Sequence, residues 1–156
     1  MKYLFLTLFL LISSIGFSGC NSSEKTSAKN LQVENLIDTT QNREIKIKIA
    51  NQTFDVILEN NPTTNALIKK LPLECDMLEL NSNEKYFYLS ESLPTNSIKP
   101  RKIQGGDLML YGDNCLVLFY KDFETNYSYT RLGQIKNPEN LPEIVRNNDI
   151  HAIFSK

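Results

Sequence analysis

The stretch from Glu44 to Lys156 alternates short apolar runs with turn signals, and this pattern most constrains the fold. Isoleucines occupy every second position of Glu44–Ala50, and apolar residues do so again in Thr53–Glu59, with Asn51-Gln52 between them. Residues two apart on a strand face the same side, so each segment has one buried face. Together the two segments predict a β-hairpin.

Strands dominate the rest of this stretch. Helices are expected over Pro62–Leu71, with Asn61 as N-cap, and over Pro138–Arg146, where Pro142 requires the helix to begin nearby. A long loop covers Ser90–Lys102. The further predicted strands are Leu73–Leu80, Lys85–Leu89, Asp107–Tyr111, Cys115–Tyr120, Tyr127–Arg131 continuing as Gly133–Ile135, and Ile150–Phe154. This pattern predicts a mainly β fold, a sandwich or a closed barrel, of seven or eight strands with two short helices.

The N-terminus has the pattern of an export signal. Lys2 precedes an almost uninterrupted apolar run, Tyr3–Ile12, and small residues follow up to Ser18-Gly19-Cys20. This run is too short for an ordinary membrane-spanning helix. The Ser-Gly-Cys ending resembles the lipobox of bacterial lipoproteins, although Phe17 stands where that motif usually has Leu. The resemblance implies lipidation at Cys20; the alternative is a plain signal peptide cut near Gly19.

The chain therefore divides into three parts. Residues 1–19 are predicted to be a lipoprotein signal peptide, residues 20–43 a polar tether without aromatic residues, and residues 44–156 one compact domain. The expected location is the bacterial cell envelope, facing the periplasm or the cell surface. The lipid on Cys20 is the only membrane attachment that this interpretation requires.

The composition narrows the classes of function. With 17 Lys and Arg against 18 Asp and Glu, the chain has no electrostatic footprint for nucleic acid. A single histidine, His151, and no closely spaced cysteine pair make a zinc site or a Ser-His-Asp triad unexpected. No metal or other cofactor is predicted. Cys75 and Cys115 lie in apolar strand-like runs, so a buried free thiol is favoured for each over a disulfide between them.

The segment Ile103-Gln104-Gly105-Gly106-Asp107 resembles the signature of cyclophilins, which are peptidyl-prolyl isomerases. The domain also resembles a smaller bacterial group, the cyclophilin-like family, most recognisably over Ile103–Tyr120. The resemblance extends to the helix after the first hairpin and to Leu132–Ile135. It implies a closed β-barrel of about eight strands with two flanking helices.

Several positions depart from the isomerase pattern. Asn96 stands where the family has the arginine that assists rotation of the proline amide. Arg101 and Lys102 replace the apolar pair that lines the floor of the proline pocket. The family's pocket histidine falls near Tyr129, and its tryptophan has no counterpart. Amide rotation has a barrier of roughly 18–20 kcal/mol and needs an apolar pocket with a well-placed donor. The fold is therefore expected without the activity.

The remaining candidates are polar and aromatic residues that could line a cleft. The predicted ligand-binding residues are Gln104, Phe119, Tyr129 and Arg131, and no catalytic residue is predicted. For Tyr127 and Tyr129, a core role and a ligand platform both remain open, because tyrosine has an apolar body and a polar tip. For Gln104 and Asp107, the structural alternative is the stabilisation of a Gly-Gly turn.

These features favour a lipid-anchored binding module that takes a peptide or small ligand in a cleft between the Ser90–Lys102 loop and the Phe119–Arg131 strands. The alternative functions are a degenerate prolyl isomerase acting on exported proteins and a structural partner of an envelope assembly.

Overall fold

A computed structural model describes residues 43–156. The predicted signal peptide, the lipidation site Cys20 and all of the tether except Arg43 lie outside the described residues. The first strand begins at Glu44, where the alternating pattern starts. Among residues 43–156, no helix has the length and apolar character needed to cross a bilayer.

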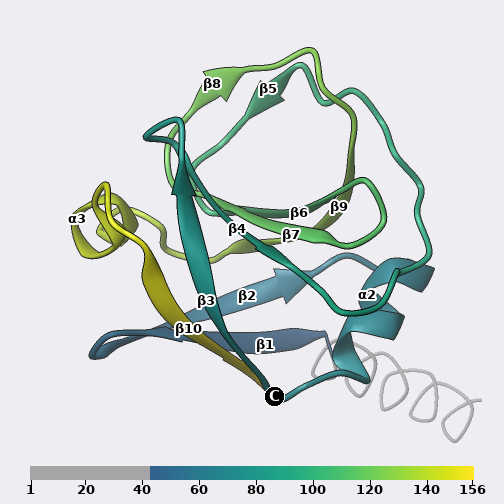
Figure 1. Cartoon of the computed structure of the whole chain (residues 1–156), viewed down its shortest axis with the longest axis horizontal. Helices are drawn as coiled ribbons and strands as arrows, with labels where there is room; N and C mark the ends of the chain where they lie inside the picture. Colours follow the sequence, from purple (N-terminus) through teal and green to yellow (C-terminus); the bar gives the residue numbers. More distant parts are fainter. Residues whose placement is uncertain (1–42) are drawn as a thin grey trace, which may run out of the picture. The chain divides into compact units, whose positions relative to one another are not determined.

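Eight antiparallel strands close into a barrel in the order β1-β10-β3-β4-β7-β6-β9-β2 (Figure 1). The barrel strands are β1 (Glu44–Ile49), β2 (Gln52–Leu58), β3 (Leu73–Leu80), β4 (Glu84–Tyr88), β6 (Asp107–Tyr111), β7 (Cys115–Phe119), β9 (Tyr129–Ile135) and β10 (Ile150–Ser155). The prediction of a mainly β, closed barrel is confirmed, and a sandwich is excluded. Closure gives each of these strands two hydrogen-bonded neighbours.

Two short helices, α2 (Pro62–Ile68) and α3 (Leu141–Val145), complete the predicted set. Asn61 caps α2 as expected: its side chain accepts a hydrogen bond from the Thr64 N–H at 2.9 Å. The helix ends before the predicted Leu71, with Lys69 as its C-cap. Pro142 lies in the first turn of α3, where its missing N–H costs no intrahelical hydrogen bond.

A second, two-stranded sheet was not predicted. It pairs β5 (Lys102–Ile103) with β8 (Phe123–Glu124) and lies away from α2 and the β1–β2 hairpin (Figure 1). Ile103 on β5 is fully buried. Two-residue strands have no detectable period, so the sequence could not separate them from the loops around them.

The interior of the barrel is filled by the inward faces of its strands. Ile45 and Ile47 of β1 meet Phe54 of β2 and Phe154 of β10 in one continuous cluster of buried residues. The alternation seen in the sequence sets this arrangement, because residues at even spacing share the inner face. Tertiary burial of this kind is the main stabilising contribution to a small domain.

A charged residue closes one end of the barrel. Lys85 on β4 is fully buried, and its ammonium group forms an ion pair with Glu79 of β3. It also donates hydrogen bonds to the carbonyl oxygens of Arg146 at 2.8 Å and Asn148 at 2.7 Å. The Tyr120 hydroxyl donates to the same Glu79 carboxylate at 2.9 Å. These contacts hold the segment between α3 and β10 against β3 and β4.

Cys75 and Cys115 are both free and buried. Cys75 belongs to the cluster inside the barrel, whereas Cys115 belongs to a second apolar cluster outside it. The preference for free thiols is confirmed.

Candidate functional site

Four neighbouring strands, β4, β7, β6 and β9, present aromatic side chains on the outer face of the barrel. The strand register aligns Tyr88, Cys115, Tyr111 and Tyr129 in one row across the four strands. Tyr86 and Val117 lie opposite one another in the next row. Neighbours directly opposite one another in a sheet have side chains close enough to pack. The row therefore gathers tyrosines that are far apart in the sequence.

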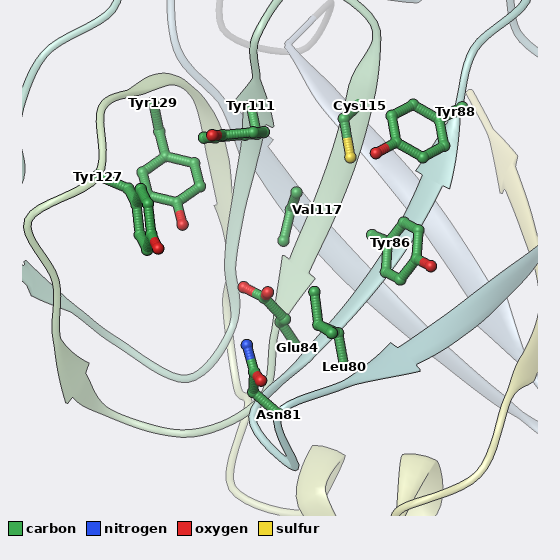
Figure 2. A pocket seen from close by; sticks show the side chains of 10 residues that line it. All are labelled: Leu80, Asn81, Glu84, Tyr86, Tyr88, Tyr111, Cys115, Val117, Tyr127 and Tyr129. Atoms are coloured by element: carbon green, nitrogen blue, oxygen red, sulfur yellow. The ribbon is translucent and has the colours of Figure 1, made fainter.

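These side chains surround a cavity of about 290 Å³, here called the tyrosine pocket (Figure 2). Two tyrosines come from β4, and the others come from β6, β9 and the segment before β9. The lining residues are Leu80, Asn81, Glu84, Tyr86, Tyr88, Tyr111, Cys115, Val117, Tyr127 and Tyr129. None of them carries a positive charge. The pocket thus combines aromatic walls with one carboxylate.

The tyrosine rings make edge-on contacts with one another. The centroids of Tyr86 and Tyr88 are 5.7 Å apart at 78°, and those of Tyr111 and Tyr127 are 6.1 Å apart at 89°. Tyr111 and Tyr129 are tilted at 53° with centroids 5.6 Å apart. Such geometries are favourable for aromatic pairs. The two sides of the pocket are therefore held by contacts within each group of tyrosines.

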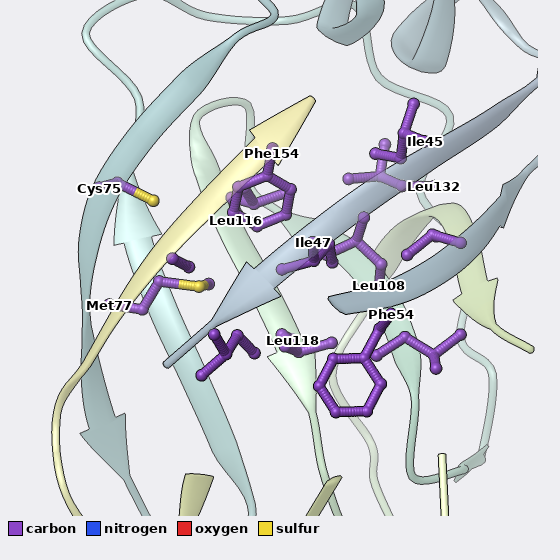
Figure 3. Close-up of a cluster of buried hydrophobic side chains, with 14 of the residues drawn as sticks. Ile45, Ile47, Phe54, Cys75, Met77, Leu108, Leu116, Leu118, Leu132 and Phe154 are labelled. Carbon is purple, nitrogen blue, oxygen red and sulfur yellow. The ribbon is translucent and has the colours of Figure 1, made fainter. Parts of the chain in front are cut away.

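Strand β7 separates this pocket from the barrel interior. Its inward residues Leu116 and Leu118 belong to the barrel core (Figure 3), whereas Cys115, Val117 and Phe119 face outward. The outward residues form a second apolar cluster with Tyr129. A substitution in the pocket therefore alters contacts on the outer wall of the barrel and not in its interior.

Glu84 lies at the first position of β4 and points into the pocket between the two groups of tyrosines (Figure 2). Only 8% of the residue is exposed. Within residues 43–156, no hydrogen bond or ion pair reaches its carboxylate. Burial, and to a lesser extent the negative charge of Glu79, raises the pKa of Glu84 from 4.5 to about 7.

Glu84 also affects the neighbouring acidic groups. Burial, followed by the charge of Glu84, raises the pKa of the Cys115 thiol to about 11. The same two causes, in the same order, raise the pKa of Tyr129 to about 12. Both groups are therefore neutral near pH 7, and Glu84 is the one lining residue that changes charge near this pH.

The four predicted ligand-binding residues do not form one site. Phe119 and Tyr129 pack edge to face with centroids 5.5 Å apart, and only Tyr129 lines the tyrosine pocket. Phe119 is fully buried. Tyr129 is 5% exposed, so it belongs to the second apolar cluster and also contributes to the pocket wall. The two roles left open by the sequence are combined in this one side chain.

Gln104 and Arg131 meet around Asp107 instead. Asp107 is buried and accepts a hydrogen bond from the backbone N–H of Gln104 at 2.9 Å, while an Arg131 guanidinium nitrogen lies 3.4 Å from its other carboxylate oxygen. Asp107 thus stabilises the Gly-Gly turn, which is the structural role that the sequence analysis gave as the alternative to ligand binding. The side chain of Gln104 is exposed.

Glycine is required within the same turn. Gly106 has a φ of +92°, and a Cβ atom there would lie 2.8 Å from the Cβ of Pro138. The Gln-Gly-Gly-Asp motif therefore has a structural explanation in this chain.

The Ser90–Lys102 loop was expected beside the cleft. None of its residues lines the tyrosine pocket. The loop instead contacts β9 through Ile98, whose N–H donates to the Tyr129 carbonyl at 2.9 Å. Asn96 is exposed, and its backbone N–H donates to the Thr130 hydroxyl at 3.0 Å.

The sequence does contain a signal for the β4 residues that line the pocket and were not predicted. Glu84, Tyr86 and Tyr88 alternate with Lys85 and Phe87, so strand period alone places the first three on one face. The consecutive aromatic residues Tyr86, Phe87 and Tyr88 predict a strand but do not by themselves indicate a pocket. The meeting of β4 with Tyr111 and Tyr127 depends on strand order, which the sequence did not supply.

Comparisons with known proteins agree with the barrel. The model of the Cyclophilin-like family matches residues 47–155. No curated protein matches the sequence at a significant level. The solution structure of the hypothetical protein AF2241 from Archaeoglobus fulgidus is similar, with a TM-score of 0.50, 15% identity, and coverage of 72% of this chain and 93% of that one. At this identity the likeness concerns the fold alone. The family match spans most of the chain and its closed barrel, and the chain belongs to the cyclophilin-like family.

Proposed function

We propose that this protein is a non-enzymatic binding module, lipid-anchored at Cys20 in the bacterial envelope, whose ligand site is the tyrosine pocket. The observation that carries the binding role is a cavity walled by five tyrosines with a buried, unpaired carboxylate directed into it. Concave, mainly apolar sites with a few well-placed polar groups are the usual form of ligand pockets. The ligand class is a small molecule or a short part of a peptide.

The positions that depart from the isomerase pattern argue against prolyl isomerase activity in this proposal. Arg101 and Lys102 are charged and exposed, and Asn96 is exposed, with its backbone N–H donating to the Thr130 hydroxyl. An isomerase needs an apolar pocket for the proline ring and a donor for its nitrogen. The three replaced positions therefore favour binding without catalysis, and no observation favours the isomerase alternative.

Ligand binding can be tested by ¹⁹F NMR of the full-length protein labelled with 3-fluorotyrosine. A library of small fragments of mixed charge should contain binders that shift the resonances of Tyr88, Tyr111 and Tyr127. The Tyr120 resonance should stay in place, because Tyr120 lies in the barrel cluster and hydrogen-bonds Glu79. Replacing Tyr111, which is 45% exposed, with Ala should weaken the binders at least about fivefold, as expected for a hot-spot aromatic residue.

The control variant is Ile57→Ala. Ile57 is 54% exposed on β2 and lies outside the tyrosine pocket, so its truncation removes a similar exposed apolar surface. Fragment affinities should not change in this variant. If no fragment shifts the pocket tyrosines, or if Tyr111→Ala binds as tightly as the wild type, the pocket is not a ligand site.

The anchoring proposal has a separate test at Cys20. Thioether-linked lipid needs the Cys20 sulfur, and several acyl chains on one terminus hold a protein firmly at a bilayer. Cys20→Ala should therefore move the protein from the membrane fraction to the soluble fraction of bacterial cells. Cys75→Ala is the matched control, because that thiol lies inside the barrel, and should leave fractionation unchanged. Membrane retention of the Cys20→Ala protein would contradict lipidation.

A further inference from the structure

We propose that the tyrosine pocket selects a small organic cation, whose ammonium group lies against the tyrosine rings with Glu84 as its counter-ion. This inference rests on the proposed function, since it names the ligand class of the same site. It concerns charge and size, which the proposed function leaves open.

The charge argument begins with Glu84. Glu84 is only 8% exposed as a residue, and a carboxylate that loses most of its hydration is destabilised unless it is paired, hydrogen-bonded or protonated. Nearby Glu79 already has partners, because it accepts from Lys85 and from the Tyr120 hydroxyl. Glu84 has no such partner in the part of the chain that the structure describes, and no cationic residue lines the pocket. A positively charged ligand would supply the missing counter-charge.

The aromatic argument is independent of Glu84. The face of a tyrosine ring attracts a cation within about 6 Å of its centroid, and several rings around one cavity are a known way to hold alkylated ammonium groups. Tyr86 and Tyr88 lie on one side of the pocket, and Tyr111, Tyr127 and Tyr129 on the other (Figure 2). A ligand placed between them contacts rings from both sides.

The size of the cavity favours a compact group. Its volume of about 290 Å³ is just below the range of roughly 300–1,000 Å³ for small-molecule sites. The floor is formed by Cys115 and Val117, which offer apolar contact to methyl or methylene groups. An alkylammonium group thus matches the pocket in charge, shape and polarity.

The affinity of the tyrosine pocket for a cation should also depend on pH. The ionisable groups coupled to Glu84 are Glu79 on β3, Cys115 on β7 and Tyr129 on β9. The other ionisable side chains of the pocket are those of Tyr86, Tyr88, Tyr111 and Tyr127. The raised pKa values of Cys115 and Tyr129 keep both neutral below pH 9, and Glu79 is paired with Lys85. Cation binding requires ionised Glu84, whose pKa is about 7. Affinity for a permanently charged ligand should therefore rise about tenfold between pH 6 and pH 8.

The test compares choline with its uncharged isostere, 3,3-dimethylbutan-1-ol, by isothermal titration of the full-length protein. Choline should bind at least about tenfold more tightly than the isostere. Glu84→Gln keeps the size of the side chain and should remove most of this difference together with the pH dependence. Glu139→Gln, a change at an exposed carboxylate outside the pocket, is the control and should behave as wild type. A melting curve checks that Glu84→Gln remains folded.

A second probe distinguishes the sources of the ammonium group. The capped peptide acetyl-Gly-Lys-Gly-amide presents a lysine side chain, whereas choline is a free small cation. Choline binding at least as tightly as the peptide supports the proposal of a small ligand, and tighter binding of the peptide contradicts it.

The outcomes separate the two proposals. If choline and its isostere bind the pocket equally, or if Glu84→Gln leaves choline binding unchanged, the cation inference is overturned while the binding site remains. If the fragment experiment shows no ligand in the pocket, both proposals fail.

Discussion

Replacing Lys85 with Met is expected to lower the free energy of unfolding by about 3–5 kcal/mol, the range observed when one partner of a buried ion pair is removed. The change leaves the Glu79 carboxylate without its counter-ion and the carbonyl oxygens of Arg146 and Asn148 without their donor. Met is similar in size, so the loss reflects charge and hydrogen bonding more than packing. Urea denaturation of the full-length protein measures the effect.

Two further variants make this prediction specific. Lys48→Met changes an exposed lysine on β1 and should cost less than about 1 kcal/mol. The double variant Lys85→Met with Glu79→Leu removes both charges and should recover part of the loss, because no uncompensated ion remains. If Lys85→Met is no more destabilising than Lys48→Met, the buried ion pair does not hold this end of the barrel.

The second large effect is expected at Gly133 on β9. A Cβ atom there would lie 2.2 Å from the Ile57 carbonyl oxygen and 3.0 Å from the Leu58 Cα. Both are backbone atoms of β2, so the clash can be relieved only by separating two paired strands. Gly133→Ala should therefore cost about 3 kcal/mol or more, at or above the usual range for overpacking.

Gly112→Ala is the matched control for this substitution. Gly112 has a φ of +62° in the turn between β6 and β7, and a Cβ atom there would meet nothing within 4 Å. Its cost is conformational and should be about 1 kcal/mol. Thermal unfolding of both variants compares the two mechanisms. Equal losses would show that the close approach of β2 and β9 is not what requires glycine at position 133.

Local rules predicted most strands and both helices, whereas the choice of a closed barrel over a sandwich followed from the resemblance to cyclophilins. Apolar alternation identified β1 and β2, and the Asn61-Pro62 pair identified the start of α2. Predicted ends differ from the observed ones by a residue or two at most strands, since strand ends are set by pairing and not by the local pattern. Strand β9 begins two residues later than predicted, at Tyr129; its pairing with β6 shifts register at Leu132, next to the interruption predicted near Gly133.

The site was harder to predict than the fold for a physical reason. Lys85 and Glu84 are adjacent charged residues, and no local rule indicates that one closes the barrel end while the other enters a pocket. Their different surroundings come from the order of β3, β4 and β7 in the barrel, which brings Glu79 beside Lys85 and Phe119 beside Glu84. Likewise, Arg131 shares the outer strand face of Tyr129 as expected, yet Asp107 and Glu59 attract its guanidinium.

Closure of the barrel has a consequence for the recognition of peptides. Each of the eight barrel strands already has a hydrogen-bonded neighbour on both sides, so an extended peptide finds no complete strand edge of the barrel to join. In the described part of the chain, the β5–β8 pair is a separate two-stranded sheet, and each of its strands has one edge without a strand neighbour. A partner that binds the barrel wall must therefore be recognised through its side chains or functional groups, with its own backbone hydrogen bonds left to water or to the partner itself.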